Sequence, residues 1–109
     1  MIQPTASFKE NLQLLPSAGH LVRIELMDPT NKLVATIENQ PGKQGSLVVY
    51  QYLSKTFDVI DAQAAAHGIE VFAEHTADAK KNRGAHPNID HLLDIIDGAP
   101  ALNVRLITT

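Results

Sequence analysis

The spacing of apolar residues changes period along this chain, and that change constrains the fold more than any other feature of the sequence. Apolar and polar residues alternate from His20 to Met27 and again from Leu33 to Ile37, as half-buried strands require. From Ser46 to His67 the apolar residues instead recur every three or four positions, as in an amphipathic helix. The chain is therefore predicted to combine strands and helices.

Shorter patterns complete the predicted order of elements. Capping and proline signals predict helices over residues 7–15 and 87–97. Alternation predicts a third strand over residues 69–74 and a fourth over residues 102–107. Gly68 is interpreted as the stop of the long helix. The predicted order is α-β-β-α-β-α-β.

This order predicts an α/β fold of two layers, similar to an α+β sandwich, with a four-stranded mixed sheet and helices mainly on one face. Strands one and two would form an antiparallel hairpin. Two consecutive β-α-β units would make strands two, three and four parallel through right-handed crossovers. A parallel sheet covered on both faces would read as continuous apolar runs, so the alternation predicts one open face. The residues predicted on that face are Arg23, Glu25, Thr36, Glu70, Phe72, Asn103 and Arg105.

The open face is either exposed to water or covered by another copy of the chain. Phe72, Val34 and Ile107 would give it apolar content. Symmetric dimers are common among soluble oligomers, so a homodimer through this face is one hypothesis. A monomer by light scattering would remove it.

Length and composition limit the class of protein. The 109 residues, 44% of them hydrophobic, fit a single globular domain over residues 1–109. Cysteine is absent, which excludes thiolate metal sites and cysteine nucleophiles. No basic and apolar leader and no membrane-spanning run is present, so a soluble cytoplasmic protein without a membrane partner is expected.

A glycine-rich loop follows the second predicted strand and is the first candidate site. Gly42 and Gly45 permit unusual backbone angles, Lys43 offers a cation, and Ser46 opens a helix whose free N–H groups attract anions. The spacing does not match a phosphate-binding P-loop, and such turns often serve only to reverse the chain. A small anionic ligand and a purely structural turn both stay open.

The stretch from Ala73 to Asp94 holds three of the five histidines and is the second candidate site. His75 and His86, with one of Asp78, Asp90 or His91, could supply three ligands to a catalytic divalent metal such as zinc. The pattern lacks the H-E-x-x-H spacing of known zinc enzymes. A divalent metal is therefore a cofactor hypothesis without a matching motif.

The same residues have two other interpretations. Structurally, His86 and Asn88 would cap the helix that begins at Pro87. Chemically, Glu74 with His75 or His86 could exchange protons near neutral pH. The candidate nucleophiles are Ser46 and Thr76, and no nucleophile-elbow motif accompanies either of them.

Nucleic acid is a weaker partner hypothesis. The net charge of −3 argues against a general polyphosphate binder. The basic residues that could contact a backbone are Lys43, Lys80, Lys81 and Arg83, and exposed loop charges of this kind are usually only solvated.

Three segments carry a family resemblance: IENQPGKQGSLVVY, GIEVFAEHTADA and HPNIDHLL. Through PGKQGSLVVY, AEHTADA and HPNID the chain resembles, over nearly its whole length, a small family of uncharacterised bacterial proteins. That resemblance implies a bacterial origin and a compact single domain. It implies no activity, cofactor or catalytic residue.

The sequence therefore favours a small bacterial α/β protein of unknown function that binds a ligand or a protein partner without catalysis. The ligands of open α/β sheets lie beyond the carboxyl ends of the strands, where the loops after strands two and three are expected. The predicted ligand-binding residues are Gly42, Lys43, Gly45, Ser46, Glu74, His75 and His86. The alternative is a metal-assisted hydrolase with His75, His86, Asp78 and Asp90 as the metal-binding residues.

Overall fold

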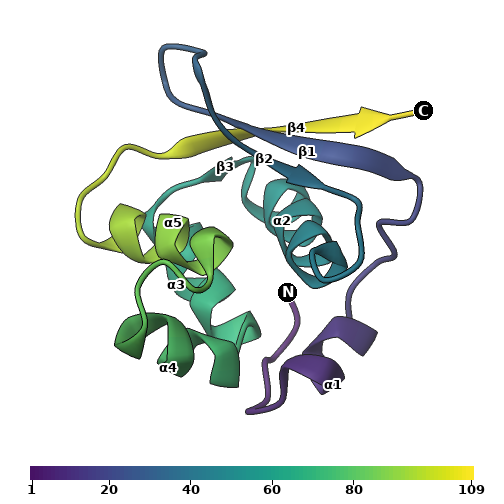
Figure 1. Cartoon of the computed structure of the whole chain (residues 1–109), viewed down its shortest axis with the longest axis vertical. Coiled ribbons are helices and arrows are strands. Elements are labelled where there is room, and N and C mark those ends of the chain that lie inside the picture. Colours follow the sequence, from purple (N-terminus) through teal and green to yellow (C-terminus); the bar gives the residue numbers. More distant parts are fainter.

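The computed structural model describes residues Met1–Thr109 and arranges them as a sheet with a layer of helices against one face (Figure 1). The elements are α1 (Phe8–Gln13), β1 (Leu21–Met27), β2 (Leu33–Glu38), α2 (Gln44–Phe57), β3 (Val59–Ile60), α3 (Ala62–Val71), α4 (Glu74–Lys81), α5 (Pro87–Ile96) and β4 (Leu102–Thr108). The sheet order is β2-β1-β4-β3. The two-layer α/β fold, its four strands and the order of its elements are confirmed, with three consecutive helices in place of the last one predicted.

The hairpin of β1 and β2 forms as expected because its turn is fixed by one aspartate. The Asp28 carboxylate accepts the backbone N–H groups of Thr30 and Lys32, each at 2.9 Å. Asn31 takes a positive φ of 69°, which asparagine tolerates better than most residues. The register then sets Ile24 opposite Ile37, and both are buried.

The core lies between the sheet and the helices. Twenty-two buried residues form one cluster. Ile24 and Leu26 of β1 are fully buried on the helix side, where Leu47 and Leu53 of α2 are also buried. Burying one such side chain stabilises the fold by roughly 1.5–3 kcal/mol, so this cluster fixes the sheet on its helical layer.

The third strand does not lie where the alternation predicts it. Residues 69–71 belong to α3, and the third strand is the two-residue β3 that follows α2. Gly68 lies inside α3. A larger residue would not fit there, because a Cβ would come within 2.8 Å of a methyl of Leu92 and 2.9 Å of one of Leu53. This glycine permits close helix packing, so its interpretation as a helix stop is wrong.

The predicted long helix is interrupted after Phe57. Asp58 adopts a φ of 65°, which turns the chain out of α2 and into β3. Asp61 then caps α3, because its carboxylate accepts the backbone N–H of Ala64 at 2.9 Å. The single predicted helix is therefore two helices with a short strand between them.

The expectation of a mixed sheet with parallel strands is also wrong. Every neighbouring pair, β1 with β2, β1 with β4 and β3 with β4, is antiparallel. The reason is the position of β4, which pairs between β1 and β3 and so separates β2 from the strand that follows α2. The sheet therefore has no adjacent parallel strands for a right-handed β-α-β crossover to join.

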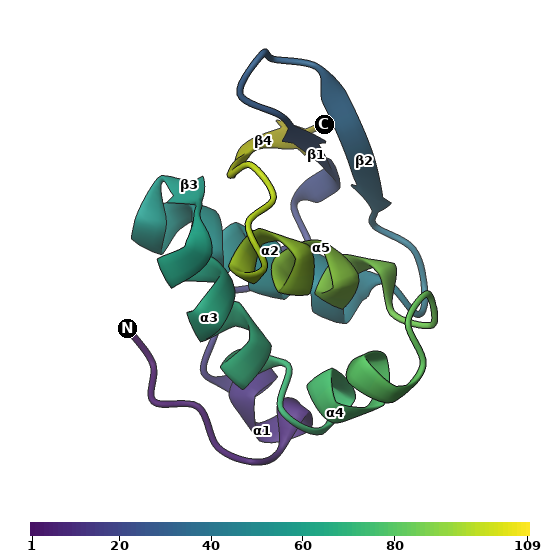
Figure 2. The ribbon, with the colours of Figure 1, turned by 90° about the vertical axis from the view of Figure 1, so that its left-hand side faces the viewer.

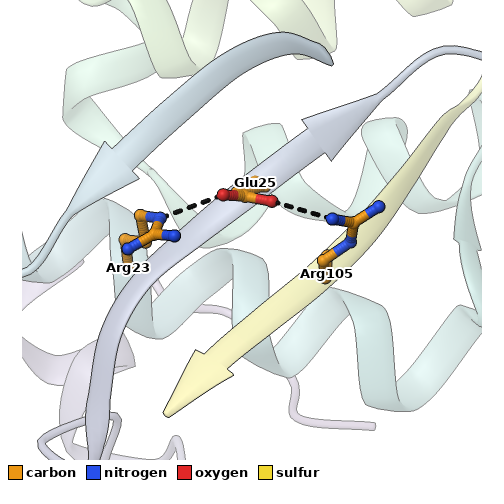
Figure 3. Close-up of polar contacts among 3 residues, drawn as sticks. All are labelled: Arg23, Glu25 and Arg105. Carbon is orange, nitrogen blue, oxygen red and sulfur yellow. Dashed lines mark hydrogen bonds and ion pairs between the residues drawn. The ribbon is translucent and has the colours of Figure 1, made fainter. Parts of the chain in front are cut away.

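The open face of the sheet carries a row of ionic contacts (Figure 3). Glu25 accepts from Arg23 at 3.0 Å and from Arg105 on the neighbouring strand at 3.3 Å. Glu70 and Phe72, which were expected on this face, lie instead in α3 and at its end, where Phe72 is only 3% exposed. A homodimer through this face stays a prediction, without the apolar contribution of Phe72.

The helices of this protein are short. None of them is long and apolar enough to cross a membrane.

Candidate functional site

The two loops singled out in the sequence converge on one groove. The groove has a volume of about 730 Å³, which is in the range of small-molecule sites. It is lined by Phe8, Leu12, Ala35, Thr36, Gly42, Lys43, Gln44, Gly45, Ser46, Phe72, His75, Ala85, His86, Pro87, Asn88, Ile89 and His91. In Figure 2, α2 and α5 both begin on the right-hand side, near the end of β2 and above α4.

The first turn of α2 brings unpaired backbone donors to the groove. Gly42, with a φ of 86°, and the bond from Lys43 N–H to Gln40 C=O at 2.9 Å close the preceding turn. Lys43 occupies the capping position, and no side chain caps the helix. The N–H groups of Gln44, Gly45 and Ser46 therefore meet no acceptor within the chain.

Gly45 favours the close contact between α1 and α2. A Cβ at this position would lie 3.0 Å from the ring of Phe8, closer than ordinary packing allows. The absence of a side chain lets the Phe8 ring approach the start of α2. The glycine predicted for loop flexibility thus serves to seat an aromatic ring beside the free N–H groups.

The start of α5 is held by an ionic clamp. Arg83 contacts Asp90 at 3.0 Å and Asp94 at 2.7 Å, and Gly84 N–H donates to Asp90 at 2.8 Å. The hydrogen bond to Asp94, with the nearby Asp90 charge, raises the pKa of the Arg83 guanidinium. The clamp folds the loop back over the helix and thereby brings His86 to the groove.

A buried tyrosine ties α5 to α2. Tyr50 is fully buried, and its O–H donates to the C=O of Asn88 at 2.5 Å. Burial raises the pKa of Tyr50 far above its ordinary value. The backbone N–H of Asn88, in the first turn of α5, meets no acceptor within the chain. The starts of α2 and α5 therefore both line the groove, with three free N–H groups on α2 and one on α5.

Aromatic rings form the floor of the groove. Phe8 stacks on Phe72 with the ring centres 5.3 Å apart, and its ring meets His75 edge to face at 5.0 Å. The His75 and His86 rings lie 5.7 Å apart. The groove therefore has an apolar base and a polar rim.

Glu74 does not line the groove, although it is among the predicted ligand-binding residues. Its carboxylate accepts the N–H of Phe8, the first residue of α1, at 2.7 Å. This bond is the main reason that the pKa of Glu74 lies below its ordinary value. Glu74 therefore positions Phe8. The other six predicted residues, Gly42, Lys43, Gly45, Ser46, His75 and His86, all line the groove.

Asn11 anchors α1 from its buried side. The side chain is completely buried, and its amide donates to the C=O groups of Thr5 at 3.1 Å and of Val71 at 3.0 Å. Its oxygen accepts from Thr5 N–H at 2.7 Å. These bonds fix α1, and with it Phe8, against the end of α3.

The ionisable side chains of the lining are all basic. The lining includes Lys43 and the three histidines His75, His86 and His91, but no aspartate or glutamate. The whole chain has the opposite excess, with 12 acidic residues against 9 basic ones. Asp78 is outside the lining, and its carboxylate is hydrogen-bonded to His86 Nε2 at 2.6 Å. That bond lowers the pKa of Asp78.

The predicted metal ligands do not gather around one point. No group of three or more histidine, aspartate or glutamate side chains is arranged to hold a metal ion. Asp90 forms an ion pair with Arg83. Of the other candidate metal ligands, Asp78 contacts only His86. No cage for a divalent cation results from this arrangement.

The candidate nucleophiles and caps differ in their surroundings. Thr76 is buried, and its O–H donates to Ile69 C=O at 2.6 Å. Ser46 lines the groove, and its hydroxyl makes no hydrogen bond within the chain. His86 stands at the capping position of α5, but its side chain does not bond to the helix. The predicted capping role of His86 is therefore wrong.

Sequence reasoning missed the groove residues that other elements supply. Phe8, Leu12 and Phe72 come from α1 and the end of α3, and the only site role considered for His91 was that of a third metal ligand. The helical spacing of Phe8 and Leu12 indicates one apolar face but not what it covers. His86 and His91 are five residues apart, a spacing that does not place two side chains on one face of a helix, so no local pattern indicated that they share a surface.

Comparison with known proteins identifies a family but no relative with a described function. A family model described as an uncharacterized protein conserved in bacteria matches residues 8–106. No curated protein and no solved structure matches the chain. All residues that line the groove fall inside the matched range.

Proposed function

Because the chain belongs to DUF2322, a family of uncharacterized proteins conserved in bacteria, we propose its function from the groove: it binds a small organic anion without changing it. The anionic group lies between the starts of α2 and α5. The apolar body of the ligand rests on the aromatic floor.

The absence of carboxylates from the lining carries this proposal. One lysine and three histidines face the groove, although the chain as a whole has more acidic than basic residues. Free N–H groups at the starts of two helices add positive partial charge at the same place. Lys43 and the first turn of α2 are the central contacts, and His86 faces them from α5.

The floor supports an organic rather than an inorganic anion. Phe8, Leu12, Phe72 and Ile89 line the groove and would contact a hydrocarbon chain or ring. Burying a hydrocarbon against such a floor contributes about 25 cal/mol per Å² of apolar surface. Inorganic phosphate would accept hydrogen bonds from the free N–H groups but would leave the apolar floor in contact with water.

Binding without catalysis is supported by the environment of the reactive groups. Thr76 is bonded to a backbone carbonyl, Glu74 to the start of α1, and Asp90 to Arg83. His86 is the one imidazole with a carboxylate partner. A binding site needs no more than the donors and the floor already described.

Calorimetric titration with four probes tests the proposal. We expect hexanoate to bind, inorganic phosphate to bind more weakly, and hexylamine and hexanol to bind least. Hexylamine has the same apolar body as hexanoate with the opposite charge. Equal affinity for hexanoate and hexylamine would show that the groove does not select an anion.

A pair of charge reversals localises the binding. Lys43→Glu should weaken hexanoate binding at least about tenfold, because it introduces repulsion beside the free N–H groups. Lys9→Glu makes the same change on α1, at an exposed residue that does not line the groove. It should leave the affinity within about twofold. Equal loss in both variants would assign the effect to net charge rather than to the groove.

A further inference from the structure

An unpaired edge of the sheet forms one wall of the groove. β2 is the outermost strand, and its residues Ala35 and Thr36 line the groove. The geometry points to one class of ligand, the C-terminal end of a partner polypeptide. Its last residues add to β2 as a short strand, and its terminal carboxylate meets the start of α2. This inference rests on the proposed anion site and names its ligand.

The backbone of Thr36 is free to pair with an added strand. In an antiparallel ladder, successive residues direct their N–H and C=O groups alternately to the two sides. Asn39 N–H donates to Val22 C=O at 3.1 Å, so Ile37 and Ala35 also face β1. Thr36 therefore directs both of its groups away from the sheet, and nothing in the chain meets them. Edges of this kind accept an additional strand.

The direction of β2 selects a chain end with a carboxylate. β2 runs toward the turn at Gly42, and α2 begins directly after that turn. A polypeptide parallel to β2 would therefore finish at the first turn of α2. Its terminal carboxylate would meet the free N–H groups of residues 44–46 and the Lys43 side chain. An internal segment of a polypeptide has no charge to offer at this position.

The length of the regular edge limits the contact to a few residues. The ladder between β1 and β2 shifts register between Ala35 and Leu33. Regular pairing thus extends only from Ala35 to Glu38, and the C=O of Glu38 already accepts from Gln40 N–H at 3.0 Å. About three residues can pair. The apolar floor beside Phe8 and Leu12 accommodates the last side chain, which is therefore apolar.

The experiment compares two displays of one random hexapeptide library on the wild-type protein, one with free C-terminal carboxylates and one with C-terminal amides. We expect enrichment only from the free-acid display, with an apolar last residue. Amidation of a selected peptide should weaken binding at least about tenfold, because the charge-assisted bonds to the helix start are lost. Equal binding of acid and amide would overturn the inference.

N-methylation of the selected peptide tests the added strand without altering the protein. Methylation of the one amide that faces Thr36 C=O should weaken binding about tenfold, and methylation of the next amide should matter little, because only alternate amides face β2. Uniform tolerance of methylation would overturn strand addition. Thr36→Pro removes the edge N–H at a position where an outer strand accepts proline, and Thr36→Ala is its matched control.

The outcomes separate this inference from the proposed function. If hexanoate binds and no free-acid peptide is selected, the anion site stands and the polypeptide ligand is wrong. If neither binds, both proposals fail. If light scattering shows a dimer that Thr36→Pro dissociates, a second copy of the chain occupies the edge, which also overturns the inference.

Discussion

The open face of the sheet and the groove both hold cationic side chains, and they differ in what those cations meet. On the open face, Arg23 and Arg105 share the carboxylate of Glu25. In the groove, Lys43 has no acidic neighbour in the lining, and the adjacent helix start has three free N–H groups. Charge by itself therefore does not distinguish a site from a surface. Under the proposed function, donors without acceptors make that distinction.

Some polar residues near the groove have a structural role. Glu74, Asn11 and Arg83 are polar residues near the groove, and each already has partners within the chain. Their bonds hold α1 and the start of α5 in place. The proposed function assigns ligand contact to the residues whose groups are free.

Asn11→Ala should have the largest effect on folding. It leaves the C=O of Val71 and the N–H of Thr5 without their partner on the buried side of α1, so we expect a loss of about 2–3 kcal/mol in the free energy of unfolding. Urea denaturation measures this loss. Asn103→Ala, an exposed change on the open face, is the control and should stay within about 0.5 kcal/mol. Equal losses would show that α1 does not depend on Asn11.

Ala73→Gly should stabilise the protein. Ala73 joins α3 to α4 with a φ of 52° and a ψ of −120°, a region that suits glycine. Relief of this strain should exceed the entropic cost of glycine and raise the free energy of unfolding by about 1 kcal/mol. Ala77→Gly, inside α4 and exposed, should lower it by about 1 kcal/mol. Thermal denaturation of both variants checks the opposite signs, and two losses would contradict the strain at Ala73.

The sequence predicts the hairpin well because its signals are local. Alternation over β1 and β2 and the turn chemistry of Asp28 specify both strands and their pairing. The start of α5 at Pro87 is equally local. The two loops were expected at the same edge for a different reason, that both would follow parallel strands, and the antiparallel sheet shows that this premise is wrong. The groove depends on where β2 ends and where α5 begins, and both positions were predicted.

The middle of the chain is misread because its decisive contacts are distant. The alternation over residues 69–74 is short, and it covers the end of α3 and the junction with α4. The buried residues of α3, Ala64, Ala65, Gly68 and Val71, follow the helical period instead. Glycine ends a helix in many sequences. Here Gly68 lies under Leu53 and Leu92, and no local pattern reports that contact. The two residues of β3 are too few to show any period.

Glu25→Gln tests the distinction on the open face itself. The change leaves Arg23 and Arg105 without an acidic partner, so the two regions then both hold unpaired cations. Because the open face lacks helix N–H groups, we expect no hexanoate binding at this face, and a stability loss below about 1 kcal/mol that shrinks as salt rises. Calorimetric titration at low salt checks the absence of hexanoate binding. A second hexanoate site in this variant would mean that unpaired cations alone make an anion site.

Glu74→Gln should have the smallest effect, and that effect should depend on pH. The pKa of Glu74 lies below its ordinary value of 4.5 in the folded protein, mainly because the carboxylate accepts Phe8 N–H. A lowered folded pKa favours the folded state above the unfolded pKa, and this contribution is lost as the pH falls through the folded pKa. The Tm of the wild type should thus exceed that of the variant at pH 7, and the gap should close in acid.

Glu38→Gln is the matched control for this titration. Glu38 makes no side-chain hydrogen bond within the chain, so its replacement should shift the Tm little at either pH. A gap for Glu74→Gln that stayed constant down to pH 3 would show that the carboxylate does not hold the start of α1. In that case Phe8 would owe its place in the groove to Gly45 and Phe72 alone, and the floor would keep its shape in acid, where the charge of Glu74 is lost.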